Sequence, residues 1–373
     1  MMNDALAANA AEWHRARRVI AVRLDNLGDV LMTTPALAAI KETLPQSHLT
    51  LLASPSGSAL APYLPFINDV IAVRAPWVKH AFPPTDSEVH RTAAVITEGQ
   101  FDAAVIFTTY TQSALPAALL MMLAGIPLRL AHVRENPYQL LTNWVREREP
   151  TIARHEVERQ LDLVRTIGIT TANDRLRMVL RRADFEAARS RLSQAGIDPE
   201  SPYLVVHPGA SAPSRRYPAD RFGAAAGLLA REWPVQIVFT GTADEAHLVN
   251  AACQQISDDV VVASLAGELD VGEFAAVIAD ASILITNNSG PAHIAAAVGT
   301  PVIDLYALTN PQHTPWRVQS RVLNFDVPCR NCLSSVCTQG HHLCLNGVTA
   351  GEVATAALEL LRQTTTARAL ELA

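Results

Sequence analysis

Short apolar runs alternate along this chain with longer segments whose apolar residues recur at helical spacing. In the first half, the runs that we expect to form buried strands are residues 18–24, 49–53, 70–73 and 103–107. Helical spacing covers residues 30–44, 113–123 and 154–167. A second series begins at residues 203–207, with further strands expected near 235–240, 260–264, 281–285 and 301–305. This alternation predicts an α/β protein with doubly wound parallel sheets.

The alternation is interrupted at two points. Residues 131–152 are rich in Arg, Asn and Pro and are expected to be irregular, and residues 184–200 read as a helix and connector. We therefore predict a first domain at residues 1–185 and a second at 186–348, which includes a cysteine-rich segment at 328–345. Residues 349–373 are predicted to form a C-terminal helix and tail.

Composition narrows the class of protein. Apolar residues make up 49% of the chain and aromatic residues 5%, which is typical of a soluble α/β enzyme. The net charge of −6 argues against a nucleic-acid partner. No apolar run reaches the roughly 18 to 20 residues that cross a membrane, and the first residues lack a signal-peptide pattern. We expect a cytoplasmic protein, with at most peripheral contact at the inner face of the cytoplasmic membrane.

Polar turns follow several of the expected strands, where ligands bind in open α/β sheets. Asp29 follows the first strand at a helix start, where it is either a capping carboxylate or a general base. The turn from His207 to Pro218 contains Ser211 and Arg215, a combination that suits a diphosphate. A surface loop with solvated arginines is the alternative reading of that turn.

Two further turns carry ligand-binding side chains. Asp244 and Glu245 follow the expected strand at 235–240 and suit either a ribose diol or a helix N-terminus. The run from Thr286 to His293 reads as strand, tight turn and helix, and its first free N–H groups suit a phosphate. An ordinary capped helix is the alternative.

Together these turns resemble glycosyltransferase family 9, the ADP-heptose:lipopolysaccharide heptosyltransferases. Three segments carry the resemblance, which extends from Arg18 to about Leu361: residues 23–37, 207–218 and 287–293. It implies a GT-B fold, in which two Rossmann-like domains face a cleft. It also implies inverting transfer of a sugar, expected to be heptose, from a nucleoside-diphosphate donor such as ADP-heptose. The acceptor would be a lipopolysaccharide core or another cell-surface glycan or glycolipid.

The resemblance also implies roles for individual residues. Asp29 matches the catalytic base, and no cofactor is required for catalysis. The remaining matches are donor-binding residues: Ser211, Arg215, Asp244, Glu245, Asn288, Ser289, Gly290 and His293. Asn288 departs from the family pattern, because heptosyltransferases carry Asp there in contact with the sugar. Asn keeps an acceptor oxygen but loses the negative charge.

Two other groups of residues are candidates for binding. Arg129 and Arg134 are predicted either to hold an acidic acceptor or to form loop salt bridges. A cluster of four cysteines suggests a structural Zn or other metal, with free thiols and disulfides as alternatives; its members are Cys329, Cys332, Cys337 and Cys344. Two other functions stay open: a GT-B-like nucleotide-sugar epimerase, and a nucleotide-sugar-binding homologue without catalysis.

Overall fold

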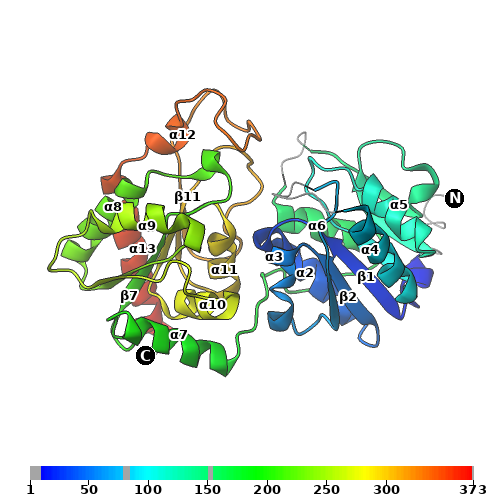
Figure 1. The fold of residues 1–373 in the computed structure, drawn as a ribbon, viewed down its shortest axis with the longest axis horizontal. Coiled ribbons are helices and arrows are strands. Elements are labelled where there is room, and N and C mark those ends of the chain that lie inside the picture. Colours follow the sequence, from blue (N-terminus) through cyan, green and yellow to red (C-terminus); the bar gives the residue numbers. More distant parts are fainter. Residues whose placement is uncertain (1–9, 79–84, 150–153, 372–373) are drawn as a thin grey trace. The chain divides into compact units, whose positions relative to one another are not determined.

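The computed structural model describes residues 10–78, 85–149 and 154–371. The chain divides into two compact units, Met1–Arg177 and Met178–Ala373. Each unit contains one six-stranded parallel sheet with helices packed on it (Figure 1). The prediction of two α/β domains built on doubly wound parallel sheets is confirmed.

The first unit has the strand order β3-β2-β1-β4-β5-β6, in which the direction of winding reverses between β1 and β4. Its strands are β1 (Arg18–Arg23), β2 (His48–Ala53), β3 (Asp69–Ala72), β4 (Ala103–Ile106), β5 (Leu128–Val133) and β6 (Asn143–Arg146). Its helices are α2 (Leu27–Thr43), α3 (Pro55–Ser58), α4 (Asp86–Glu98), α5 (Leu115–Leu123) and α6 (Glu156–Arg165).

The second unit repeats this topology, with the order β12-β11-β10-β7-β8-β9 and the reversal between β7 and β10. Its strands are β7 (Tyr203–His207), β8 (Gln236–Phe239), β9 (Val262–Ser264), β10 (Leu284–Asn287), β11 (Val302–Leu305) and β12 (Ser320–Leu323). Its helices are α7 (Arg182–Gln194), α8 (Ala219–Glu232), α9 (Ala246–Cys253), α10 (Val271–Asp280), α11 (Gly290–Val298), α12 (Leu343–Asn346) and α13 (Ala350–Glu371).

Helix α2 follows β1 directly and is buried on nearly all sides. Its residues from Val30 to Ile40 form an uninterrupted buried run, so the helix has no polar stripe. Pro35 lies within the helix and supplies no N–H for the carbonyl of Leu31. The Thr34 hydroxyl donates to that carbonyl instead, at 2.6 Å, so the proline leaves no buried acceptor unsatisfied there.

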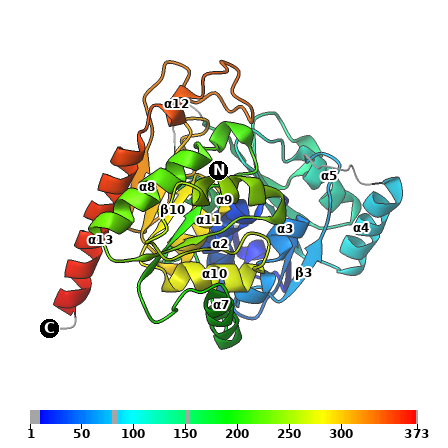
Figure 2. The same cartoon turned by 60° about the vertical axis from the view of Figure 1, so that its left-hand side comes forward.

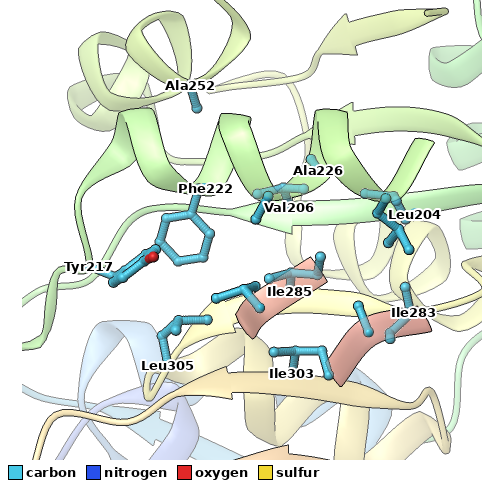
Figure 3. Close-up of a cluster of buried hydrophobic side chains, with 14 of the residues drawn as sticks. Leu204, Val206, Tyr217, Phe222, Ala226, Ala252, Ile283, Ile285, Ile303 and Leu305 are labelled. Atoms are coloured by element: carbon cyan, nitrogen blue, oxygen red, sulfur yellow. The ribbon is translucent and has the colours of Figure 1, made fainter. Parts of the chain in front are cut away.

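The core of the second unit lies between its sheet and the pair α8 and α13, which run side by side (Figure 2). Figure 3 shows Phe222 and Ala226 of α8 pointing toward the strand residues Ile285 and Leu305. Helix α13 contributes Val353, Ala357 and Leu360 to the same core. Burial of each large apolar side chain contributes about 1.5–3 kcal/mol to the free energy of unfolding, so the packing of α13 stabilises the second unit.

The structure corrects the prediction that residues 131–152 are irregular. Strand β5 ends at Val133, and β6 occupies Asn143–Arg146 within that segment. Strand β12 was also not predicted. Among the described residues, no helix is long and apolar enough to cross a membrane.

Candidate functional site

Asp29 lies in the first turn of α2, at the carboxyl edge of the first sheet. Its Oδ2 accepts a hydrogen bond from the Asn26 N–H at 3.2 Å, and its Oδ1 accepts from Arg23 Nη2 at 3.2 Å. The side chain is 16% exposed. The capping role and the role of a general base are therefore compatible, because the carboxylate is held at the helix start and still reaches solvent.

Asn287 ties together the turns that follow β7 and β10. This fully buried side chain donates from Nδ2 to the carbonyls of Pro208, at 2.8 Å, and Gly209, at 3.2 Å. Its Oδ1 accepts from the Tyr217 N–H at 2.9 Å. The loop from residue 208 to residue 217 is thus fixed at both ends against the end of β10.

Helix α11 begins immediately after this point, with Ser289 as its N-cap. The Ser289 side chain makes no capping hydrogen bond, and its hydroxyl donates instead to the carbonyl of Asn287 at 3.3 Å. The Gly290 N–H is therefore not satisfied by the cap side chain, while Pro291 has no N–H and the Ala292 N–H donates to the Ser289 carbonyl at 3.1 Å. An N–H at the start of a helix suits an anion, and phosphate binding here stays a prediction.

Arg215 ends a 3-10 turn, Pro213–Arg215, in the loop that Asn287 fixes. Its side chain is half-buried, and its Nε is buried without a hydrogen-bond partner. The fully buried carboxyl of Asp304, on β11, lies near enough to interact electrostatically with Arg215. Burial raises the pKa of Asp304 well above its usual value, and the charge of Arg215 partly offsets this rise.

Asn288 is 4% exposed, and its Oδ1 also lacks a hydrogen-bond partner. Its backbone N–H donates to the carbonyl of Leu305 at 3.3 Å, which places it beside the end of β11. Ser211, in the same region of the second unit, is exposed, and His293 is buried on α11.

Glu245 lies directly against Gly209. A Cβ added at Gly209 would lie 2.3 Å from the Glu245 carboxyl carbon. The Glu245 carboxylate accepts from the Thr242 N–H at 3.0 Å and lies 3.8 Å from Nε2 of His207. Burial lowers the pKa of His207 to about 4, and Glu245 counteracts part of this effect. His207 is therefore neutral at pH 7. Asp244 is exposed.

Arg129 and Arg134 have different environments. Arg129 is buried, and each of its guanidinium nitrogens donates to a backbone carbonyl; the acceptors include Leu140 at 2.7 Å and Gln139 at 2.8 Å. It therefore holds the 138–140 segment against β5. Arg134 is exposed and donates to the carbonyl of Thr111 at 2.9 Å. Acceptor binding by these arginines stays a prediction.

The cysteine-rich segment contains free thiols. Cys332 is exposed, and the other three cysteines of the cluster are half-buried. Within the described part of the chain, no three His, Cys, Asp or Glu side chains are placed to hold a metal ion. The geometry of these residues does not fit the structural Zn that their spacing suggested.

Sequence reasoning gave no individual role to three residues that build these sites: Arg23, Asn287 and Asp304. Arg23 and Asp304 both interrupt or end buried apolar strands, and a charged residue in such a run is the signal that could have identified them. No local signal distinguished Asn287 from its neighbour Asn288.

Comparison with known proteins identifies the family of this chain. Residues 89–343 match the model of glycosyltransferase family 9 (heptosyltransferase). Lipopolysaccharide heptosyltransferase 3 of Escherichia coli is 26% identical over 296 residues, which cover 78% of this chain and 83% of that protein.

Two solved structures have a similar fold. The family 9 glycosyltransferase of Veillonella parvula has a TM-score of 0.78 at 24% identity and covers 93% of this chain and 98% of its own. The E. coli ADP-heptose lipopolysaccharide heptosyltransferase II has a TM-score of 0.73 at 22% identity, with coverage of 93% and 99%. The fold is therefore that of the GT-B heptosyltransferases. The chain belongs to glycosyltransferase family 9, the heptosyltransferase family, and is a glycosyltransferase.

Proposed function

We propose that this protein transfers heptose from ADP-heptose to a lipopolysaccharide core acceptor, with inversion at the anomeric carbon and without a metal. One observation carries the proposal: Asp29 holds a partly exposed carboxylate at the carboxyl edge of a parallel sheet, fixed by Arg23 and the Asn26 N–H. The family relationship supports the choice of heptose and lipopolysaccharide.

In the proposed reaction, the Asp29 carboxylate accepts the proton of an acceptor hydroxyl. The hydroxyl oxygen forms a bond to the anomeric carbon while the bond between that carbon and the diphosphate oxygen breaks. The departing diphosphate keeps the electron pair, and Arg215 and the N–H groups at the start of α11 stabilise its charge. Because a single displacement occurs, the anomeric configuration inverts.

We also propose donor contacts for other residues of the second unit. Glu245 accepts hydrogen bonds from the ribose hydroxyls, with Asp244 beside it at the edge of the site. Asn288 offers an amide to the sugar in place of the carboxylate that the family pattern contains. Ser211 and His293 complete the predicted donor contacts, and Arg134 is proposed to contact the acceptor. The proposed location is the cytoplasm, with peripheral contact at the inner face of the membrane.

Replacement of Asp29 by Asn tests the proposal. General base catalysis contributes about 10²–10⁴-fold, so Asp29→Asn is expected to lower kcat by that factor and leave the Kd for ADP unchanged. Asp86→Asn is a matched control, because Asp86 is an exposed carboxylate in the first turn of another helix of the same unit. ADP release, product mass and anomeric configuration should be measured with ADP-heptose and core acceptors. Full turnover by Asp29→Asn, or retention of configuration, would contradict the proposal.

A further inference from the structure

Arg23 is the last residue of β1 and is fully buried. Its guanidinium group meets three carboxylates, two from the turn after β1 and one from the start of α6. Nε lies 3.1 Å from Asp25 Oδ2, Nη2 lies 3.2 Å from Asp29 Oδ1, and Nη1 lies 3.1 Å from Glu156 Oε1. One guanidinium group therefore links the proposed base to two other carboxylates.

Glu156 anchors this arrangement from the start of α6. Its side chain is fully buried, and Oε1 accepts from Gln160 Nε2 at 2.6 Å. Gln160 also donates to the carbonyl of Thr108 at 3.0 Å, which fixes α6 beside the end of β4. Arg159 lies 3.5 Å from the same Glu156 oxygen and donates to Glu147 at 2.9 Å. Glu156 thus has little freedom to move away from Arg23.

The charges around Arg23 are unequal. Burial alone would lower the pKa of Arg23, but Asp25, Glu156 and Asp29 outweigh it and raise that pKa. Burial also raises the pKa of Asp25, and the charges of Asp29 and Glu156 add to the rise while Arg23 opposes it. Carboxylates therefore outnumber the guanidinium groups that face them.

The next groups along the network are Arg159, Glu147, Arg154 and His132. Arg159 and Arg154 both pair with Glu147. Burial, followed by the charge of Arg159, lowers the pKa of His132 to about 3, so His132 is neutral at pH 7. Arg23 brings a positive charge to 3.2 Å from Asp29 Oδ1, and it shares this charge with Asp25 and Glu156.

We propose that Arg23 is a positioning residue that fixes the orientation of the Asp29 carboxylate, and that Glu156 keeps Asp29 basic by sharing the Arg23 guanidinium. This inference rests on the proposed role of Asp29 as the base. An arginine paired with Asp29 alone would stabilise the ionised carboxylate and make it a poor proton acceptor. Glu156 and Asp25 weaken that effect, while the Arg23 hydrogen bond keeps one carboxylate oxygen in place.

The pH dependence of kcat/KM distinguishes this role from a purely structural one. In Glu156→Gln the amide still accepts from Arg23, but one negative charge is lost, so the pKa of Asp29 falls. We expect the acidic limb of the profile to move to lower pH by about one unit and the plateau to fall. Arg23→Met should move the limb to higher pH and lower kcat, and Arg23→Lys should restore the position of the limb without full kcat, because lysine lacks the fork geometry.

Glu147→Gln is the matched control. Glu147 is also a buried carboxylate, but it pairs with Arg159 and Arg154 and lies one step further along the network. Glu147→Gln should lower the free energy of unfolding about as much as Glu156→Gln does, but it should leave the acidic limb of the pH profile nearly unmoved. If Glu156→Gln does not fold, Asp25→Asn supplies the second variant and is expected to move the limb in the same direction.

An acidic limb that stays in place in Glu156→Gln or Asp25→Asn would overturn the inference, as would an equal shift in Glu147→Gln. The proposed function is tested by a different variant, and it would be rejected if Asp29→Asn retained turnover. An inactive Asp29→Asn together with an unmoved limb therefore rejects the role of Glu156 and leaves the base assignment intact.

Discussion

Replacement of Gly209 by alanine tests the proposed ribose contact of Glu245. The added Cβ would lie 2.3 Å from the Glu245 carboxyl carbon and 2.4 Å from each oxygen. Ordinary contact begins at 3.4 Å, so the carboxylate must move by at least 1.1 Å (3.4 minus 2.3). Gly209 does not have a positive φ, so its backbone accommodates alanine, and the three atoms nearest to the added Cβ all belong to Glu245.

The expected loss follows from the hydrogen bonds that the displaced carboxylate can no longer make. A hydrogen bond to a charged group contributes about 1.5–3 kcal/mol, which corresponds to roughly 10- to 150-fold weaker ADP binding. Stability should change little, because the end of a flexible glutamate side chain can swing aside. Isothermal titration calorimetry with ADP measures the effect.

Pyrophosphate, which has no ribose, is the control ligand, and its affinity should stay within about threefold of wild type. Gly227→Ala is the control variant, because a Cβ there meets its nearest neighbour at 3.6 Å. Unchanged ADP affinity in Gly209→Ala would refute the role of Glu245. An equal loss for pyrophosphate would show instead that the turn itself had been distorted.

Two further predictions concern the stability of the second unit. Gly223→Ala on α8 would place a Cβ 2.0 Å from the carbonyl oxygen of Ala252. Because a backbone atom cannot swing aside as a side chain can, we expect the free energy of unfolding to fall by about 1–3 kcal/mol. Gly227→Ala, one turn later, should instead raise the free energy of unfolding by about 0.5–1 kcal/mol. Thermal unfolding of the two variants measures the difference, and equal shifts in Tm would contradict the packing argument. Asp304→Asn should gain stability relative to wild type as pH rises. The unfolded Asp304 ionises near pH 4 while the folded one keeps its proton, so wild-type stability falls from about pH 4 up to the folded pKa, by at most about 1.4 kcal/mol per pH unit. Urea unfolding at pH 5 and pH 8 measures this, and a constant difference between the two proteins would reject it.

The sequence predicted the alternating elements well where apolar runs were continuous. Strand β5 was missed because buried Arg129 and His132 interrupt its pattern, and their burial depends on partners contributed by other segments. Edge strand β6 alternates half-buried and exposed residues and carries little apolar signal.

The candidate site was predictable only where a residue's surroundings are local. Asp29 and Glu245 sit in capping turns whose geometry follows from neighbouring residues. Glu156 could not be linked to Asp29 in this way, because the two meet through Arg23 across more than a hundred residues of sequence. The metal prediction relied on the density of cysteines and on the first Cys-x2-Cys spacing, and neither fixes the direction in which each thiol points.

The hydrogen bonds of Asn287 have a consequence for folding. They join β10 to a loop that lies 70 to 79 residues earlier in the chain. Closing so long a loop is entropically costly, and contacts of this range form slowly. The loop from residue 208 to residue 217 is therefore fixed in place only when β10 has inserted beside β7. During refolding, recovery of ADP binding should accompany the last kinetic phase of the second unit, and a chain that ends before β10 should bind no donor.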